Sequence, residues 1–306
     1  MEERPSDLNQ PPPPRRPVRR RRAWLRRIFW AVIAIGVLAA ATWAGAALMQ
    51  HDRSRPAPVS TVPALVRLHV IFPEGFTRAQ MAERVAAVRK IAIERRGVTP
   101  RLTKGAYLAA TAKAKPPPEF RRDWPGERIE GFLFPATYEF TKHTGAGTLV
   151  RDQIGFFRRE WRKVDLRRAR SKNLTSYDVL IIASMIEKEV AVPSERPLVA
   201  AVIYNRLHLR MPLQIDATTR YGLGVPGTQS LTASELASSS PYNTRNRKGL
   251  PPTPISNPGL SSIQAAAHPA RVGYLYYVRK PDGVHHFFTE SSAEFEQKKC
   301  EYGYGC

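Results

Sequence analysis

TSYDVLIIASMIEKE, residues 175–189, is a long apolar run that ends in two carboxylates on either side of a lysine. Thr175 followed three residues later by Asp178 fits the loose Thr-x-x-Asp form of a capping box, which predicts the start of a helix. The residues after it leave no polar stripe before Glu187, and a helix that is apolar all round is an interior helix. The stretch therefore predicts a buried helix with acidic residues at its C-terminal end.

Glu189 is the more unusual of the two acids. At helical spacing it extends a stripe of aliphatic residues, namely Val179, Ile182 and Ile186. Desolvation by this stripe and the partial negative charge at a helix C-terminus both favour a protonated carboxyl, which can act as a general acid. Glu187 lies on a less apolar side and is expected to be solvated or structural. The alternative for both acids is a solvated last turn without a catalytic role, because helices commonly end in charged residues.

The composition fits a folded and strongly basic protein. The chain has 306 residues, 42% apolar content and a formal net charge of +22, so it can bury a core. Nine arginines and three acidic residues fall within the first 27 residues, and most of the positive charge lies beyond them. A basic surface suits nucleic acid, lipid headgroups or acidic cell-wall polymer, whereas a solvated basic face of an arginine-rich protein is the alternative.

The N-terminal region predicts a membrane anchor. Residues 1–27 combine a run of prolines with clustered arginines, a composition typical of a disordered basic tail. Residues 28–49 carry no charge and as a helix would span roughly 33 Å, which matches a hydrocarbon core of about 30 Å. The preceding arginines favour a cytoplasmic N-terminus and an extracytoplasmic remainder. A cleavable signal peptide is the alternative, but its apolar run would be shorter. A nucleic-acid partner would require a cytoplasmic fold, which this span opposes.

The order of expected strands and helices predicts an α+β fold. A strand near residues 66–72, a helix capped by Thr77 and later helices lead to a hairpin whose turn is PDG at residues 281–283. The predicted organisation, in chain order, is a linker at 50–64, an N-terminal α+β subdomain at 65–173, a catalytic subdomain at 174–299 and a tail at 300–306.

Several sequence blocks carry a resemblance to a known family over residues 73–295. In chain order they are PEG (73–75), IEGFLFP (129–135), ASMIEKE (183–189), SER (194–196), YNRL (204–207), LQIDAT (213–218), YG (221–222), YNT (242–244) and GLPPTPISNPG (249–259). In these blocks the chain resembles the endolytic murein transglycosylase family, also called YceG-like. Three departures from the family pattern are a linker too short for a LysM-like wall-binding portion, Ala136 in place of Asp and Thr253 in place of Gly.

The resemblance implies a membrane-anchored enzyme that cuts peptidoglycan glycan strands internally, with Glu189 as its catalytic residue. Lytic cleavage needs only one carboxylate, because the C6 hydroxyl of N-acetylmuramic acid acts as the nucleophile and a 1,6-anhydro end forms. Its implied partners are peptidoglycan glycan strands and, beyond them, synthases or the elongation and division machinery. Two alternatives stay open: a hydrolytic muramidase in which Asp216 supplies a second carboxylate, and a wall-associated scaffold without turnover.

The matching blocks also supply candidate substrate-binding residues, which are Asn205, Arg206, Gln214, Asp216, Tyr242 and Asn243. Arg206 could bind a muramyl carboxylate or form a structural ion pair with Glu187 or Glu195.

No cofactor or metal is expected, because the histidines share no metal-ligand spacing with acids or cysteines. Cys300 and Cys306 are the only cysteines in the sequence. Their spacing permits a small disulfide loop, and free or intermolecular thiols are the alternative.

Overall fold

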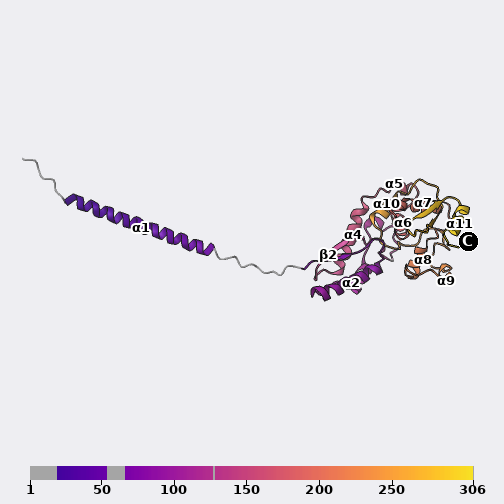
Figure 1. The fold of residues 1–306 in the computed structure, drawn as a ribbon, viewed down its shortest axis with the longest axis horizontal. Coiled ribbons are helices and arrows are strands. Elements are labelled where there is room, and N and C mark those ends of the chain that lie inside the picture. Colours follow the sequence, from indigo (N-terminus) through magenta and orange to yellow (C-terminus); the bar gives the residue numbers. More distant parts are fainter. Residues whose placement is uncertain (1–18, 54–65, 127, 306) are drawn as a thin grey trace, which may run out of the picture. The chain divides into compact units, whose positions relative to one another are not determined.

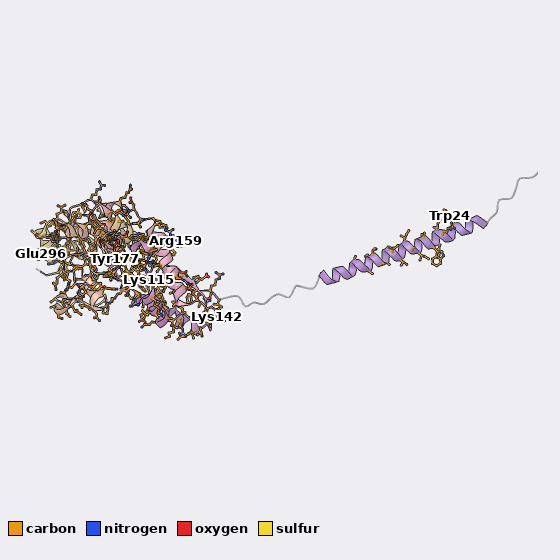
Figure 2. The ribbon with its side chains drawn as sticks, turned by 180° about the vertical axis from the view of Figure 1, so that it is seen from behind. Trp24, Lys115, Lys142, Arg159, Tyr177 and Glu296 are labelled. Carbon is orange, nitrogen blue, oxygen red and sulfur yellow. The ribbon has the colours of Figure 1, made fainter. Side chains whose placement is uncertain are left out.

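The computed structural model describes residues 19–53, 66–126 and 128–305. The chain divides into two units, Met1–Ala64 and Leu65–Cys306 (Figure 1). In the first unit, helix α1 (Arg19–Arg53) contains an apolar segment, Arg27–Ala46, with a mean hydropathy of 2.0 and no buried residues. The side chains described on this helix, Trp24 and those of residues 27–46, are exposed (Figure 2). This helix is long and apolar enough to cross a membrane.

Two sequence expectations change at this helix. Residues 19–27 were expected to be disordered but belong to α1, because arginine is a good helix former and continues the apolar helix without a break. The helix likewise runs past residue 49 as far as Arg53 and so includes the first residues of the predicted linker. Residues 1–18 and 54–65, which hold the rest of the predicted tail and linker, lie outside the described part of the chain.

The second unit mixes helices with two small sheets, as expected for this sequence. Its first half contains β1 (Leu68–Ile71), α2 (Arg78–Arg96), α3 (Lys104–Lys113), η1 (Pro118–Phe120), β2 (Thr137–Phe140), α4 (Ala146–Trp161) and α5 (Arg167–Arg170). Its second half contains α6 (Ser176–Glu189), η2 (Pro193–Glu195), α7 (Arg196–His208), α8 (Asp216–Leu223), α9 (Ala233–Leu236), α10 (Leu260–Ala267), β3 (Tyr276–Arg279), β4 (His286–Thr289) and α11 (Ser292–Glu301).

Each sheet is an antiparallel pair of short strands. β1 pairs with β2 so that Leu68 faces Phe140, and alternate residues of β1 point into the core. β3 pairs with β4 across the predicted turn. One hydrophobic cluster runs from Leu68 to Ala267 and therefore crosses residue 173, so the core is continuous where the sequence suggested a boundary between subdomains. The division at that residue stays a prediction.

Helix α6 lies at the centre of this core, as its sequence predicts. The hydroxyl of Thr175 accepts a hydrogen bond from the Asp178 backbone N–H, and the Asp178 carboxylate accepts one from the Thr175 backbone N–H, which completes the capping box. Tyr177 and every residue from Val179 to Ile186 are buried. The helix packs against α7, α8 and α10, which accounts for its apolar surface on all sides.

Asn257 connects three of the sequence blocks. Its side-chain oxygen accepts hydrogen bonds of 2.9 Å from the backbone N–H groups of Gly131 and Leu133. Its side-chain nitrogen donates to the carbonyl of Phe76 and to the carboxyl of Glu130. Asn257 is fully buried, and all its side-chain hydrogen-bonding groups are used within the protein. It therefore holds the PEG turn, the IEGFLFP segment and the SNPG segment together beside α6.

Gly131 is required where these segments meet. Its φ of +89° lies in the left-handed region, and a Cβ at this position would lie 2.7 Å from Pro254. Residues 129–135, IEGFLFP, accordingly form a buried turn, and β2 begins at Thr137.

Candidate active site

Glu189 lies at the C-terminal end of α6, where residues from other elements contact it. Glu189 is the last residue of the helix, directly after the buried aliphatic stripe, and its side chain is only partly exposed. The phenolic O–H of Tyr277 on β3 donates a hydrogen bond of 3.1 Å to Oε2 of Glu189. The backbone N–H of Ala217, in the first turn of α8, also donates to this carboxyl. Glu189 therefore lies where α6, α8 and the β3–β4 hairpin meet.

The surroundings raise the pKa of Glu189 above its ordinary value. The largest cause is desolvation, which disfavours the charged carboxylate, and the nearby charge of Asp216 acts in the same direction. The hydrogen bonds from Tyr277 and Ala217 and the charge of Arg279 act the other way. Because desolvation dominates, the carboxyl holds its proton to higher pH than a solvated glutamate, as a general acid requires.

Asp216 is the second acid at this site. It begins α8, and its Oδ1 lies 2.7 Å from Nε of Arg245. Both side chains of this ion pair are partly exposed, at 42% and 37% respectively. Asp216 thus places negative charge beside Glu189 while Arg245 holds its carboxylate in one orientation.

Gln214 and Arg206 lie next to this pair but have different accessibility. Gln214 is exposed, with a φ of +55°. Arg206 is buried and donates hydrogen bonds to the backbone carbonyls of Leu275, Pro212 and Leu213 and to the side-chain oxygen of Gln214.

Of the two roles expected for Arg206, the ion pair is not formed within the described residues, and binding of a muramyl carboxylate stays a prediction. Its Nε and Nη1 donate to backbone carbonyls and to Gln214, and within the described residues Glu187 lies near Arg196 and Glu195 near His286 instead. Arg206 holds the segment before α8 against the strand that carries Tyr277.

Three other candidates are also committed to the scaffold. Asn205 donates to the backbone carbonyls of Val272 and Tyr274, each at 2.9 Å. Asn243 is fully buried and donates to the carbonyls of Leu236 and Ser238. Of the six predicted binding residues, Gln214 is exposed and Asp216 is partly exposed, and Asp216 is the one whose charge acts on Glu189.

The third scaffold residue is Tyr242. It is buried, and its hydroxyl lies 2.8 Å from Oγ1 of Thr253. Thr253 stands where the family usually has glycine, so this contact depends on one of the departures noted in the sequence.

The surroundings of Glu187 indicate a structural role. Its side chain is 7% exposed, its Oε2 accepts a 3.0 Å hydrogen bond from the backbone N–H of Gly259, and its Oε1 lies 3.9 Å from Arg196. Gly259 is the N-cap of α10, so Glu187 fixes the start of that helix and complements its dipole.

The sequence comparison decides the family. Residues 41–301 match the YceG-like family, which is most of the chain. The chain belongs to the YceG-like family. It is 37% identical over 177 residues to an endolytic murein transglycosylase of Bacillus subtilis, which covers 57% of this chain and 48% of the relative. It is 30% identical over 257 residues to an endolytic murein transglycosylase of Streptococcus pneumoniae strain R6, which covers 78% of this chain and 45% of the relative. The chain therefore spans about half the length of these curated relatives.

A solved structure supports the YceG-like fold. The crystal structure of a YceG-like protein from Listeria monocytogenes superimposes with a TM-score of 0.62 at 29% sequence identity, and the match covers 76% of each chain. The mixed helix and sheet architecture is therefore confirmed as that of the family.

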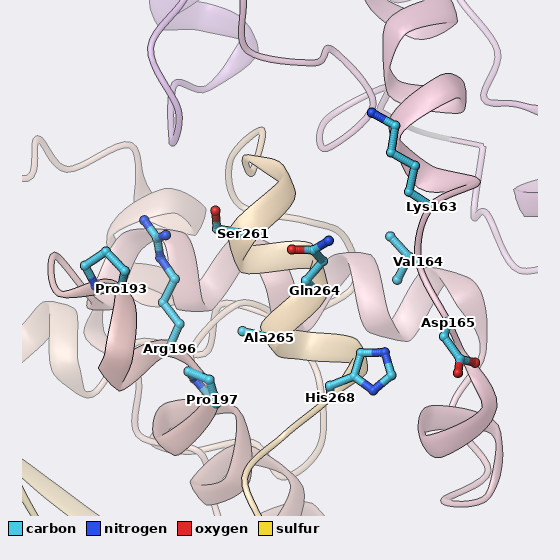
Figure 3. A pocket seen from close by; sticks show the side chains of 10 residues that line it. All are labelled: Lys163, Val164, Asp165, Pro193, Arg196, Pro197, Ser261, Gln264, Ala265 and His268. Atoms are coloured by element: carbon cyan, nitrogen blue, oxygen red, sulfur yellow. The ribbon is translucent and has the colours of Figure 1, made fainter.

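This YceG-like chain also has a cavity of about 390 Å³ that Glu189 does not line. Figure 3 shows side chains around it from α7, α10 and the segment after α4, including Arg196, Gln264 and His268. Arg196 also contacts Glu187, so the cavity lies on the Glu187 side of α6. The residues described here contain no group of three or more His, Cys, Asp or Glu that could hold a metal.

Sequence reasoning missed Tyr277, Arg279 and the Ala217 backbone as neighbours of Glu189. The alternation in YLYYVRK predicted a strand, and β3 forms there, but no pattern indicated which tyrosine would face the acid. Cys300 is disulfide-bonded, and Cys306 lies outside the described residues.

Proposed function

We propose that this chain is an endolytic lytic transglycosylase of peptidoglycan. It would cleave the bond between N-acetylmuramic acid and N-acetylglucosamine within glycan strands and leave 1,6-anhydro ends. The observation that carries the proposal is Glu189, a desolvated carboxyl with a raised pKa at the end of a buried helix. The names of the relatives favour the same reaction.

Glu189 performs both proton transfers in this proposal. Its O–H protonates the glycosidic oxygen as the C1–O bond breaks and the bonding electron pair leaves with the N-acetylglucosamine oxygen. The resulting carboxylate then accepts the proton of the muramyl C6 hydroxyl while O6 bonds to C1. Glu189 is protonated again at the end, and no water is consumed.

Asp216 and Gln214 are the accessible polar groups that would face the sugar. The negative charge of Asp216 stabilises the positive charge that develops on the ring as the glycosidic bond breaks. Arg245 holds that carboxylate by an ion pair at 2.7 Å, which suits an electrostatic role better than nucleophilic attack. The exposed amide of Gln214 can hydrogen-bond sugar substituents.

Helix α1 is proposed to anchor the enzyme in the plasma membrane. Its apolar segment is exposed along its whole length, and a cluster of arginines precedes it, which favours a cytoplasmic N-terminus. The second unit would then act outside the cytoplasm, near newly made glycan strands. Association with synthases or with the elongation and division machinery stays a prediction.

The product ends test the proposal. Mass spectrometry of peptidoglycan digested by the full-length, detergent-solubilised protein should show 1,6-anhydro ends. Reducing ends would instead support the muramidase alternative, in which Asp216 and water complete the reaction. No cleavage by a folded protein would favour the scaffold alternative.

A further inference from the structure

Tyr277 is the one side chain, within the described residues, that donates a hydrogen bond to the Glu189 carboxyl. Burial raises the pKa of Tyr277 well above its ordinary value, so the phenol keeps its proton and acts as the donor. The charged side chains that face Glu189 from neighbouring elements are Asp216 on α8 and Arg279 on β3. The Tyr277 hydroxyl and the Ala217 backbone N–H are therefore the donors that act on the Glu189 carboxyl.

Tyr277 needs support from elsewhere, because its hairpin is small. β3 and β4 have four residues each, and a two-stranded hairpin by itself is marginally stable. The support lies at His286, the first residue of β4. Oε1 of Glu195 accepts a hydrogen bond of 3.0 Å from the His286 backbone N–H, and Oε2 of Glu195 lies 2.7 Å from Nδ1 of the imidazole.

The contact between Glu195 and His286 lies next to Tyr277, the donor to Glu189. The side chains of His286 and Glu195 are 3% and 10% exposed, and the imidazole packs edge-on against the Tyr277 ring at a centroid distance of 5.5 Å. Glu195 also lies six residues after Glu189, at the end of the turn that leaves α6. The chain segment that carries the acid thus also fixes the hairpin that carries its donor.

We propose that Tyr277 is a positioning residue for Glu189 and that the buried Glu195 and His286 pair holds Tyr277 in place. This proposal rests on the proposed function of Glu189. A donor to a carboxylate favours its ionised form, whereas desolvation and Asp216 favour the protonated form. Tyr277 thereby keeps the proton affinity of Glu189 low enough for the same carboxyl to give up a proton and then take one back.

The first test compares two tyrosines on one strand. The full-length protein in detergent is assayed for anhydro-end formation from purified peptidoglycan over a range of pH. In Tyr277→Phe we expect the alkaline limb of kcat/KM to move to higher pH by about 0.5 to 1 pH unit, since one hydrogen bond to the carboxylate is lost. The maximum of kcat/KM should fall about tenfold because Glu189 is less well oriented. An alkaline limb identical to wild type would overturn the proposal.

Tyr276→Phe is the matched control. Tyr276 is adjacent on β3, and its ring stacks on Phe295 instead of facing Glu189. The control removes the same hydroxyl group from the same strand, so its pH profile should match wild type. A shift equal to that of Tyr277→Phe would mean that any change in this strand moves the profile, and the specific role of Tyr277 would be lost.

The second test addresses the buried pair. Glu195→Gln keeps the shape of the side chain but weakens its hold on His286, so its alkaline limb should move in the same direction as that of Tyr277→Phe. The double variant should move no further than Tyr277→Phe alone, because both changes act on one hydrogen bond. A Glu195→Gln profile equal to wild type, or shifts that add, would overturn the role of the pair.

A measurement without turnover separates this proposal from the proposed function. The titration of Glu189 can be followed by NMR of ¹³C-labelled glutamate carboxyls and assigned by the loss of one resonance in Glu189→Gln. The Glu189 resonance should titrate at higher pH in Tyr277→Phe than in wild type, whether or not the protein forms anhydro ends. If wild type forms no anhydro ends, the proposed function fails. If the Glu189 resonance titrates at the same pH in Tyr277→Phe as in wild type, the positioning proposal fails.

Discussion

Glu187 and Glu189 lie two residues apart on α6, yet their carboxyls bond to different parts of the fold. The Glu187 carboxylate accepts a hydrogen bond from the Gly259 N–H at the start of α10, whereas the Glu189 carboxyl accepts one from the Tyr277 hydroxyl on β3. Residues two apart on a helix point in nearly opposite directions, so one acid can be structural while its neighbour is available for chemistry.

Substitution of these two acids gives the sharpest test of the site. Glu189→Gln keeps the shape and hydrogen-bonding capacity of the side chain but removes the transferable proton. We expect a folded protein that binds glycan and loses cleavage by about two or more orders of magnitude, as for other general acid-base groups. Anhydro-end formation, glycan binding and circular dichroism would be measured together.

Glu187→Gln is the control for that experiment. It should retain most activity, with stability lower by about 1 kcal/mol because the bond to Gly259 loses its charged acceptor. If Glu187→Gln were inactive and Glu189→Gln active, the assignment of the acid would be reversed. If both were active, Glu189 would not be the catalytic acid.

Glu130 should make stability depend on pH. It is buried beside Arg78, Tyr221 and Asn257, and desolvation raises its pKa from 4.5 to about 7. A group whose pKa is raised in the folded state stabilises that state below its unfolded pKa and loses this effect as pH rises through the folded pKa. The free energy of unfolding should therefore fall by about 3 kcal/mol between pH 4.5 and pH 7 through this one group.

Urea unfolding at several pH values, compared between wild type and Glu130→Gln, measures this contribution. The glutamine variant should lack this part of the pH dependence. Glu94→Gln, in an exposed position on α2, should keep the wild-type dependence. If the free energy of unfolding of Glu130→Gln falls with pH as steeply as that of wild type, the expectation is wrong.

Gly131→Ala should destabilise the fold more than the same change at Gly126. Both glycines have φ near +90°, at +89° and +88°, so both variants carry the cost of about 1 kcal/mol for a left-handed alanine. Only at Gly131 would the new Cβ also meet Pro254, at 2.7 Å. Thermal unfolding should show a clearly larger fall in Tm for Gly131→Ala. Equal falls would show that Pro254 moves away at little cost.

Topology can be tested with a reporter fused after Cys306. Arginines precede the apolar segment of α1, so the reporter should be active only when it requires an extracytoplasmic location. A reporter fused before Arg19 should behave in the opposite way. Activity of the C-terminal fusion in the cytoplasm would contradict both the proposed location and a peptidoglycan substrate.

The basic segment at residues 158–172 should contribute an electrostatic contact with an anionic wall or membrane surface. Arg162 and Arg170 are exposed there. Pelleting of the full-length protein with purified wall or with anionic vesicles should weaken as salt rises. Arg162→Glu with Arg170→Glu should weaken pelleting more than Lys90→Glu with Arg95→Glu on α2. If the fraction of protein that pellets does not change with salt concentration, the contact is not electrostatic.

The sequence by itself determined the local features of this protein. The capping box and apolar run of residues 175–189 predicted α6 to within a residue, because capping and burial periodicity act over a few neighbouring positions. The same periodicity singled out Glu189. The uncharged run likewise predicted the apolar part of α1, although not where that helix ends.

Only the tertiary structure decided what surrounds the acid. Tyr277 is 88 residues from Glu189 along the chain, and its approach depends on how the β3–β4 hairpin packs beside α6. Asn205 and Asn243 were candidate substrate-binding residues in the sequence, but their side-chain N–H groups donate to backbone carbonyls that come close only in the folded chain. A polar residue is available to substrate only when the fold leaves its hydrogen-bonding groups unused, and no local pattern records that.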